Sequence, residues 1–356
     1  SGIEPEKDQF QYVAVDIGEE FIKVFFNGKF SLNSYSFFRL NSWADEAPEE
    51  VIFPDGLPYL YGKAADVRCL TILSNNKAEI KSAFEDGKSY SFFKSASQHI
   101  ILNEMEKIGV DLNKNIHLAV SMPARFIEEN SIDFIQHLEC FTDCNNQYIS
   151  TIKAHVFFPQ TGVFYGALRN REDKKNALAK LLETTYKERV NILALDLGYS
   201  SLGLFVFSGR REDDSSDFTF NLQSKLDKTI AEGGTSTLPF KDSVDDFTVV
   251  LDYFNTFEVD KNGEKHGNFK QLLTNIITNH LDQTLVEFDQ ILKEKYASVD
   301  AIVVGGGGSI FLNSSIIRDV FKIDKSAPIV FADKPLYAAA SGMVAMLEDH
   351  YNFIQR

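Results

Sequence analysis

The chain has 356 residues and a formal net charge of −15, with 44% hydrophobic and 24% charged residues. This length allows two domains with cores of their own, and the acidity argues against direct nucleic-acid binding, which needs a basic surface. Three cysteines, Cys69, Cys140 and Cys144, are too few for a disulfide framework, so we expect the protein to reside in a reducing cytoplasm. No apolar run approaches the ~20 residues of a membrane span, and we expect no membrane insertion.

Apolar runs of strand length alternate with helical stretches along the chain. Helical patterns cover residues 174–190 and 268–296. The expected strands, bounded by Gly, Pro or Asp, lie within residues 12–18, 21–26, 116–123, 154–159, 191–198, 202–207 and 301–308. This alternation predicts α/β layering.

One pattern occurs twice. The segments VAVDIGEEFIKVFF and ILALDLGYSSLGLFVF each contain an apolar strand, Asp, an apolar residue, Gly, a short linker and a second apolar strand. The two aspartates, Asp16 and Asp196, are 180 residues apart, so the repeat indicates a duplicated domain rather than a solenoid.

The repeated pattern predicts two hairpins that bind phosphate groups. Exposed backbone N–H groups at Gly18 and Gly198 can form an anion-binding concavity, and Ser200 and Ser201 add donors beside Tyr199. An aspartate at each strand end suits Mg²⁺, which it would hold mostly through water. Asp16 and Asp196 are therefore the metal candidates, although each could instead simply cap a turn.

A glycine run follows the last expected strand. Gly305, Gly306, Gly307 and Gly308, followed by Ser309, lack a Cβ that would keep a flat or anionic ligand from the backbone. A tight turn from a strand into a helix explains such a run equally well. The run gains specificity because it follows two Asp-Gly turns.

Together these motifs resemble the actin-like ATPase superfamily, which includes actin, Hsp70 and the sugar kinases. The two Asp-Gly turns look like its phosphate motifs, and the glycine run looks like its adenosine motif. The segments DIGEEFIKV, YGKAA (61–65), AVSMP, FFPQTGVFYGAL (157–168) and PLYAAASGM (335–343) are most similar to bacterial ParM/StbA plasmid-segregation proteins. The resemblance covers residues 12–350.

The resemblance implies an actin-like (ribonuclease H-like), duplicated two-domain α/β fold with a nucleotide cleft between the domains. Domain I would cover residues 10–168 and be completed by a C-terminal helix at 333–356, and domain II would cover 169–332. The implied ligands are ATP or ADP with Mg²⁺. The implied partners are further copies of the chain in a filament and a DNA-binding adaptor for plasmid segregation.

The resemblance also implies roles for single residues. Gln160 would position the attacking water and act with Asp16 in catalysis, although it could be an ordinary polar residue after Pro159. Lys23 would contact phosphate, unless it is a solvated strand residue. Three further residues, Gly233, Gly234 and Thr235, would lie beside the sugar and phosphates and begin a helix.

Two features depart from the family pattern. Glu19 and Glu20 stand where small hydroxyl or amide residues usually donate to the terminal phosphate, and ionised carboxylates cannot donate. Three interpretations of these side chains are open: they point to solvent, one joins the metal, or efficient hydrolysis has been lost. In each case their N–H groups could still serve. Gly203 replaces a frequent aspartate and removes a metal or water contact.

Two other functions stay open at this point. A metabolite kinase of the same superfamily would need a carboxylate base beside a substrate pocket, and the sequence assigns none. A non-hydrolysing scaffold of a pilus or secretion assembly is supported by Glu19, Glu20 and Gly203.

Overall fold

The computed structural model forms two compact units. Unit 1 contains Ser1–Phe158 and Met346–Arg356, and unit 2 contains Pro159–Ala345. The structure describes residues 10–18, 21–41, 51–72, 90–122, 124–140, 152–169, 189–198, 202–210, 231–233 and 299–354.

The main sheet of unit 1 has five strands in the order β3-β2-β1-β7-β8. The strands are β1 (Gln11–Ile17), β2 (Phe21–Phe26), β3 (Lys29–Ser34), β7 (Ile116–Ser121) and β8 (Ile152–Phe157). The first three form antiparallel hairpins, whereas β7 and β8 run parallel to β1. The central strand β1 is apolar and buried: Val13, Ala14 and Val15 have no exposed surface.

The sheet of unit 2 has the order β11-β10-β9-β12-β13. Its strands are β9 (Arg189–Leu197), β10 (Leu202–Arg210), β11 (Ala231–Gly233), β12 (Ala301–Gly305) and β13 (Ile329–Phe331). Here too the first three strands are antiparallel neighbours, and β12 and β13 run parallel to β9. Strand order and direction match those of unit 1, which confirms the duplication predicted from the repeated motif.

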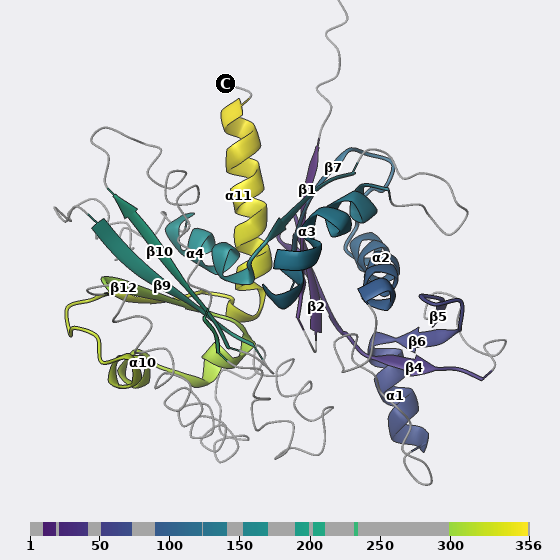
Figure 1. The fold of residues 1–356 in the computed structure, drawn as a ribbon, viewed down its shortest axis with the longest axis horizontal. Helices are drawn as coiled ribbons and strands as arrows, with labels where there is room; N and C mark the ends of the chain where they lie inside the picture. The colour runs from purple at the N-terminus through teal and green to yellow at the C-terminus, as the bar shows by residue number, and fades with distance from the viewer. Residues whose placement is uncertain are drawn as a thin grey trace, which may run out of the picture. The chain divides into compact units, whose positions relative to one another are not determined.

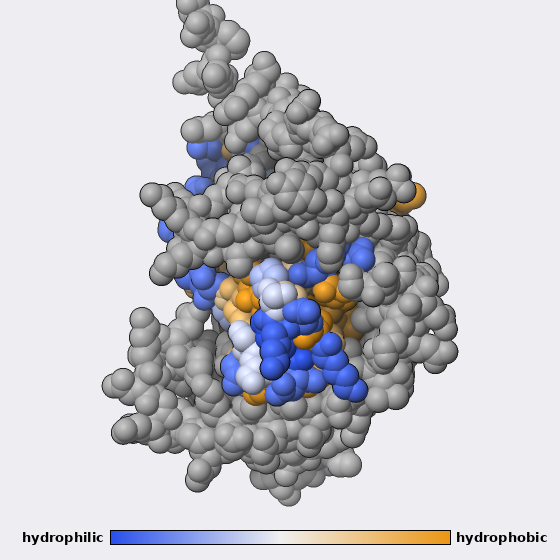
Figure 2. Space-filling model, turned by 90° about the vertical axis from the view of Figure 1, so that its left-hand side faces the viewer, coloured by the Kyte–Doolittle hydropathy of each residue, from blue (hydrophilic) through white to orange (hydrophobic). Residues whose placement is uncertain are grey.

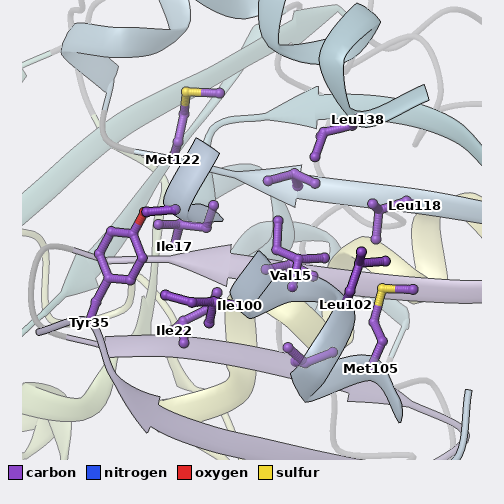
Figure 3. Packing of buried hydrophobic residues seen from close by; sticks show 14 of the residues in the cluster. Val15, Ile17, Ile22, Tyr35, Ile100, Leu102, Met105, Leu118, Met122 and Leu138 are labelled. Atoms are coloured by element: carbon purple, nitrogen blue, oxygen red, sulfur yellow. The ribbon is translucent and has the colours of Figure 1, made fainter. Parts of the chain in front are cut away.

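Helices α2 (Tyr90–Lys107) and α3 (Ala124–Glu139) pack on the main sheet of unit 1. Helix α2 contacts β2 and β3, and α3 contacts α2 and β8. Figure 3 shows how α2 contributes Ile100, Leu102 and Met105 to the core formed with strand residues such as Val15 and Ile22. Burial of these aliphatic side chains, worth about 1.5–3 kcal/mol each, stabilises this packing.

A smaller sheet precedes α2 in the chain (Figure 1). Strands β4 (Phe37–Arg39), β6 (Tyr59–Tyr61) and β5 (Val51–Ile52) pair antiparallel, and α1 (Gly62–Ile72) contacts β3, β4 and β6. In α1, the Asp66 carboxylate accepts hydrogen bonds of 2.5 Å from the Ser34 and Ser36 hydroxyls. Burial raises the pKa of Asp66, and the two hydroxyls lower it in part.

Helix α4 (Pro159–Arg169) packs on β9, β10 and β12 of unit 2. Because of these contacts α4 groups with unit 2. The resemblance implied that residues 159–168 belong to domain I. The other elements after β12 are η3 (Gly307–Phe311), α10 (Ser314–Phe321), η4 (Pro335–Tyr337) and α11 (Ala338–Ile354). The last helix begins in unit 2 and ends in unit 1, since the division falls between Ala345 and Met346.

One expected helix extends too far along the chain. Arg189 and Val190, predicted as its last residues, lie in β9, where they pair with Arg210 and Gly209 of β10. The rest of that helix, and all of residues 268–296, lie outside the described residues.

Within the described part of the chain, no helix is long and apolar enough to cross a membrane. On the face shown in Figure 2, the described residues are largely hydrophilic, with smaller hydrophobic areas between them.

Candidate functional site

The first Asp-Gly turn places a buried carboxylate at the centre of three strands. Asp16 is 4% exposed and lies opposite Lys23 of β2 and Ser121 of β7. The Lys23 ammonium donates to Asp16 Oδ2 at 2.8 Å, and the Ser121 hydroxyl donates to Oδ1 at 2.5 Å. Both carboxylate oxygens are thus hydrogen-bonded within the unit, and the lysine offsets the charge.

Lys23 was predicted to contact phosphate, and the structure places its ammonium on Asp16. The sequence contained a signal for this pairing, because Asp16 and Lys23 lie symmetrically about the break between the two apolar runs and pair across the hairpin. Ser121 was missed; as the polar residue that ends the apolar run of β7, it could have been noticed. Contact with phosphate stays a prediction for Lys23.

The second hairpin pairs its two strands in the same register as the first and has different neighbours. Asp196 lies opposite Gly203 of β10 and Gly305 of β12, the positions that Lys23 and Ser121 occupy beside Asp16. The row across unit 1 is therefore lysine, aspartate and serine, whereas the row across unit 2 is glycine, aspartate and glycine. The duplicated strands preserve the carboxylate and differ in what surrounds it.

Helix α4 lies over the row in unit 2. A Cβ built on Gly203 would lie 1.7 Å from Nε2 of Gln160, and one built on Gly305 would lie 2.8 Å from both methyl groups of Val163. Gln160 and Val163 are three residues apart and so lie on one face of the helix. The structure thus brings the predicted catalytic Gln160, which is 9% exposed, to the strand position next to Asp196.

The glycine run fits tightly against the chain itself. Gly306 has φ +84°, and a Cβ there would lie 2.3 Å from the Leu197 carbonyl oxygen and 2.6 Å from Asp196 Oδ1. A Cβ on Gly308 would lie 2.9 Å from Leu197 Cγ. Packing against the end of β9 is therefore enough to explain these two glycines, and ligand contact stays a prediction.

The first residues after β12 form a short 3₁₀ turn. Gly307 begins η3, so its N–H lies in the first turn of that helix. Ser309 is 1% exposed, and its hydroxyl donates to the Gly306 carbonyl oxygen at 2.7 Å. This hydroxyl stabilises the turn, and a nucleotide role for Ser309 stays a prediction.

Part of the predicted site can be placed only in the backbone. The Gly18 N–H donates to the Phe21 carbonyl oxygen at 2.8 Å, which closes the first hairpin. Gly198 directly follows β9, at the start of the second turn. Gly233 was expected to begin a helix together with Gly234 and Thr235, and for Gly233 that expectation is wrong: it ends strand β11 and pairs with Leu202. The other predicted site residues lie outside the described ranges: Glu19, Glu20, Tyr199, Ser200, Ser201, Gly234 and Thr235.

The described side chains suit a hard cation bound together with a ligand. Among described residues there is no group of three or more His, Cys, Asp or Glu side chains that could hold a metal by themselves. Mg²⁺ commonly keeps several waters and takes one or two carboxylates plus substrate phosphates. A single aspartate oxygen donor in each hairpin, Asp16 or Asp196, fits that type of binding.

Comparison with known proteins supports the fold. A scan against protein-family models found no match, and neither did a search of curated proteins. Among solved structures, the apo pSK41 ParM protein is 16% identical, with a TM-score of 0.54 and coverage of 98% of this chain and 99% of that chain. The ParM of a 15-stranded filament from Clostridium botulinum is 13% identical, with a TM-score of 0.54 and coverage of 95% and 99%.

The archaeal actin homolog Ta0583 is 14% identical, with a TM-score of 0.52 and coverage of 95% of this chain and 99% of that chain. Likeness at such low identity concerns the fold and leaves activity to be argued from the site. The match over nearly whole chains agrees with the duplicated sheets and confirms the actin-like fold expected from the motifs. The chain therefore has the actin-like fold, of the kind found in ParM proteins.

Proposed function

We propose that the chain binds ATP with Mg²⁺, assembles with itself into filaments and hydrolyses ATP slowly. Its cellular role would be the movement or segregation of DNA. Because the chain carries a net charge of −15, contact with DNA would require a basic adaptor protein. Self-assembly is proposed from the fold, since one similar structure is that of a ParM filament.

The equivalent placement of Asp16 and Asp196 carries the proposal. Each aspartate is the next-to-last residue of the central strand of a five-stranded sheet, one step before the turn to an antiparallel neighbour. Backbone N–H groups of such a turn suit phosphate oxygens. The same motif occurs twice in the chain, and a ligand with several phosphate groups would offer an anionic group to each copy.

The two hairpins would contribute differently to binding. In the first, the Lys23 ammonium reduces the negative charge of Asp16, which lowers the electrostatic cost of bringing phosphate oxygens near this carboxylate. In the second, Asp196 lies between two glycine positions and is the better candidate for holding water around the metal. Mg²⁺, when bound, would neutralise phosphate charge.

Hydrolysis would depend on positioning rather than on a strong base. Gln160 carries an amide oxygen that can accept from a water and an amide nitrogen that can donate. From the strand position next to Asp196, Gln160 would orient one water molecule toward the terminal phosphate together with the Asp196 carboxylate. A neutral amide is a weak base, and for this reason we propose slow hydrolysis.

Substitution of Asp196 tests the proposal. Asp196→Asn keeps the shape of the side chain and removes its charge, so we expect Mg²⁺-ATP binding to weaken by on the order of 10-fold or more. Asp300→Asn is the matched control. Asp300 is a buried carboxylate that directly precedes β12 and accepts a hydrogen bond of 2.9 Å from the N–H of Asn191, near the start of β9 and far along that strand from Asp196. Titration with a fluorescent ATP analogue at fixed free Mg²⁺ measures both affinities. Equal affinity in wild type and folded Asp196→Asn would contradict the metal role.

A further inference from the structure

We propose that Gly203 is a positioning residue for Gln160, because its missing side chain makes the space in which the glutamine amide lies beside Asp196. This inference rests on the proposed function for its catalytic meaning. It also reverses the interpretation drawn from the sequence, in which glycine at position 203 only removed a contact. The side chain that the strand lacks is supplied by α4.

The strand register identifies the position. Gly203 faces Asp196 across the β9–β10 pair, as Lys23 faces Asp16 in the first hairpin. In unit 1 this position carries a side chain that reaches the aspartate directly. In unit 2 the same position is open toward α4, and a side chain from that helix fills it.

The distances show that the Gln160 amide fills the space where a side chain at position 203 would lie. A Cβ on Gly203 would lie 1.7 Å from Gln160 Nε2, 2.9 Å from Cδ and 3.6 Å from Cγ. A contact under 3 Å between carbon and these atoms is well inside van der Waals separation. Even alanine at position 203 is therefore incompatible with the present place of the glutamine amide.

The helix itself cannot easily move away to make room. A Cβ on Gly162 of α4 would lie 2.1 Å from the Ala339 carbonyl oxygen, and one on Gly342 of α11 would lie 1.8 Å from the Gly162 carbonyl oxygen. The backbones of α4 and α11 are thus in direct contact. Val163 packs over Gly305 and fixes α4 on the sheet as well.

Because α4 is held by its backbone, a side chain at position 203 would displace the flexible end of Gln160. The fold should then survive the substitution, since only the amide must rotate. An amide moved from this space no longer lies beside Asp196. Gly203 would in this way control hydrolysis without contacting the nucleotide or the water.

The test compares four variants with the wild type. Gly203→Ala should release phosphate more slowly, by up to the ~10²-fold that loss of one positioning contact costs, with unchanged affinity for a non-hydrolysable ATP analogue. Gln160→Ala should show a similar loss. The double variant should be no slower than Gln160→Ala alone, because no amide remains to be displaced.

Gly166→Ala is the matched control on the same helix. A Cβ there would lie 3.4 Å from the Gly342 Cα, an ordinary contact, and Gln160 is not among the nearest atoms. This variant should release phosphate at the wild-type rate. A second readout is the Gln160 side-chain amide resonance, assigned by its loss in Gln160→Ala; it should shift in Gly203→Ala and stay in place in Gly166→Ala.

An unshifted amide resonance in Gly203→Ala would overturn the inference, and so would a further slowing when Gly203→Ala is added to Gln160→Ala. Full phosphate release by Gly203→Ala would overturn it too. A wild type that binds ATP and releases no phosphate contradicts the proposed hydrolysis instead, and with it the catalytic meaning of Gly203. The amide resonance then still decides whether Gly203 sets the position of Gln160.

Discussion

The buried aspartate of the first hairpin is part of a charge pair. The side chain of Asp16 is 5% exposed and that of Lys23 is 11% exposed, so water screens their attraction only weakly. Removing one member of such a pair leaves an uncompensated charge in a poorly solvated place. The pair should therefore contribute to the stability of unit 1 as well as to the charge near the turn.

We expect Lys23→Met to lower the free energy of unfolding by about 3–5 kcal/mol, the usual cost of breaking a buried pair. Lys94→Met is the control, because the Lys94–Asp133 pair at 3.0 Å is much more exposed, with side-chain exposures of 27% and 54%. Its loss should cost at most about 1 kcal/mol. Denaturant unfolding followed by circular dichroism measures both, and a loss in Lys23→Met as small as that in Lys94→Met, at most about 1 kcal/mol, would show that the Asp16 pair is unimportant for stability.

His117 is the second residue whose charge state matters for unit 1. It is 3% exposed on β7, its Nδ1 has no hydrogen-bond partner among the described residues, and its ring centroid lies 3.7 Å from that of Tyr351 in α11. Burial, together with repulsion from His155, Lys153 and His350, lowers the pKa of His117 to about 4. The folded protein thus holds this imidazole neutral.

A lowered pKa in the folded state means that the unfolded chain binds the proton more tightly. The stability contributed by neutral His117 should be complete above pH 6.5 and decrease as the pH falls toward about 4. His117→Phe keeps an aromatic ring and removes this titration, so its melting temperature should fall less over that range. If the melting temperatures of the two proteins fell in parallel with pH, this role of His117 would be wrong.

Several elements could be predicted because their signal is local. Strands β7, β9 and β12 each have at least one parallel neighbour in the sheet. They are buried and appear in the sequence as continuous apolar runs. The motif around Asp16, which recurs around Asp196, predicted a duplicated domain and hence two sheets of the same topology. By contrast, β4, β5 and β6 have only two or three residues each, too few for a periodic pattern.

Contacts between distant elements could not be predicted from such patterns. The space over Gly203 depends on how α4 crosses β10, which a strand or helix pattern does not contain. Gly233 illustrates the same limit, because the resemblance implied a helix start at Gly233, Gly234 and Thr235, and Gly233 instead pairs with Leu202. The sequence therefore predicted Asp196 and Gln160 as separate candidates and contained no sign that Gly203 joins them.

The crossing of α4 and α11 yields a prediction for paired glycines. Gly162→Ala should destabilise unit 2 by about 1–3 kcal/mol, since its Cβ would overlap the Ala339 carbonyl group. Gly166→Ala, one turn further, has room for its Cβ and should be neutral or stabilising by about 0.5–1 kcal/mol. Thermal unfolding measures the difference, and similar melting temperatures for the two variants would refute the close backbone contact.

At the scale of the whole molecule, an actin-like fold is combined with a proposed cycle of ATP binding, assembly and hydrolysis. Composition and charge argued against direct binding of nucleic acid, and the actin-like fold agrees with the motifs from which it was predicted. Assembly involves many copies of the chain, so local sequence patterns in one chain do not predict it. Coupling between assembly and nucleotide state therefore has to be measured on the intact protein.

Sedimentation of the full chain with Mg²⁺ and ATP, ADP or a non-hydrolysable ATP analogue, with phosphate release followed in parallel, tests this coupling. We expect ATP and the analogue to bring the protein into the pellet and ADP to leave it in solution. Filaments formed with ATP should disassemble as phosphate is released, while analogue filaments persist. A protein that stays in the supernatant with every nucleotide, or that pellets equally without any, would contradict a nucleotide-driven assembly.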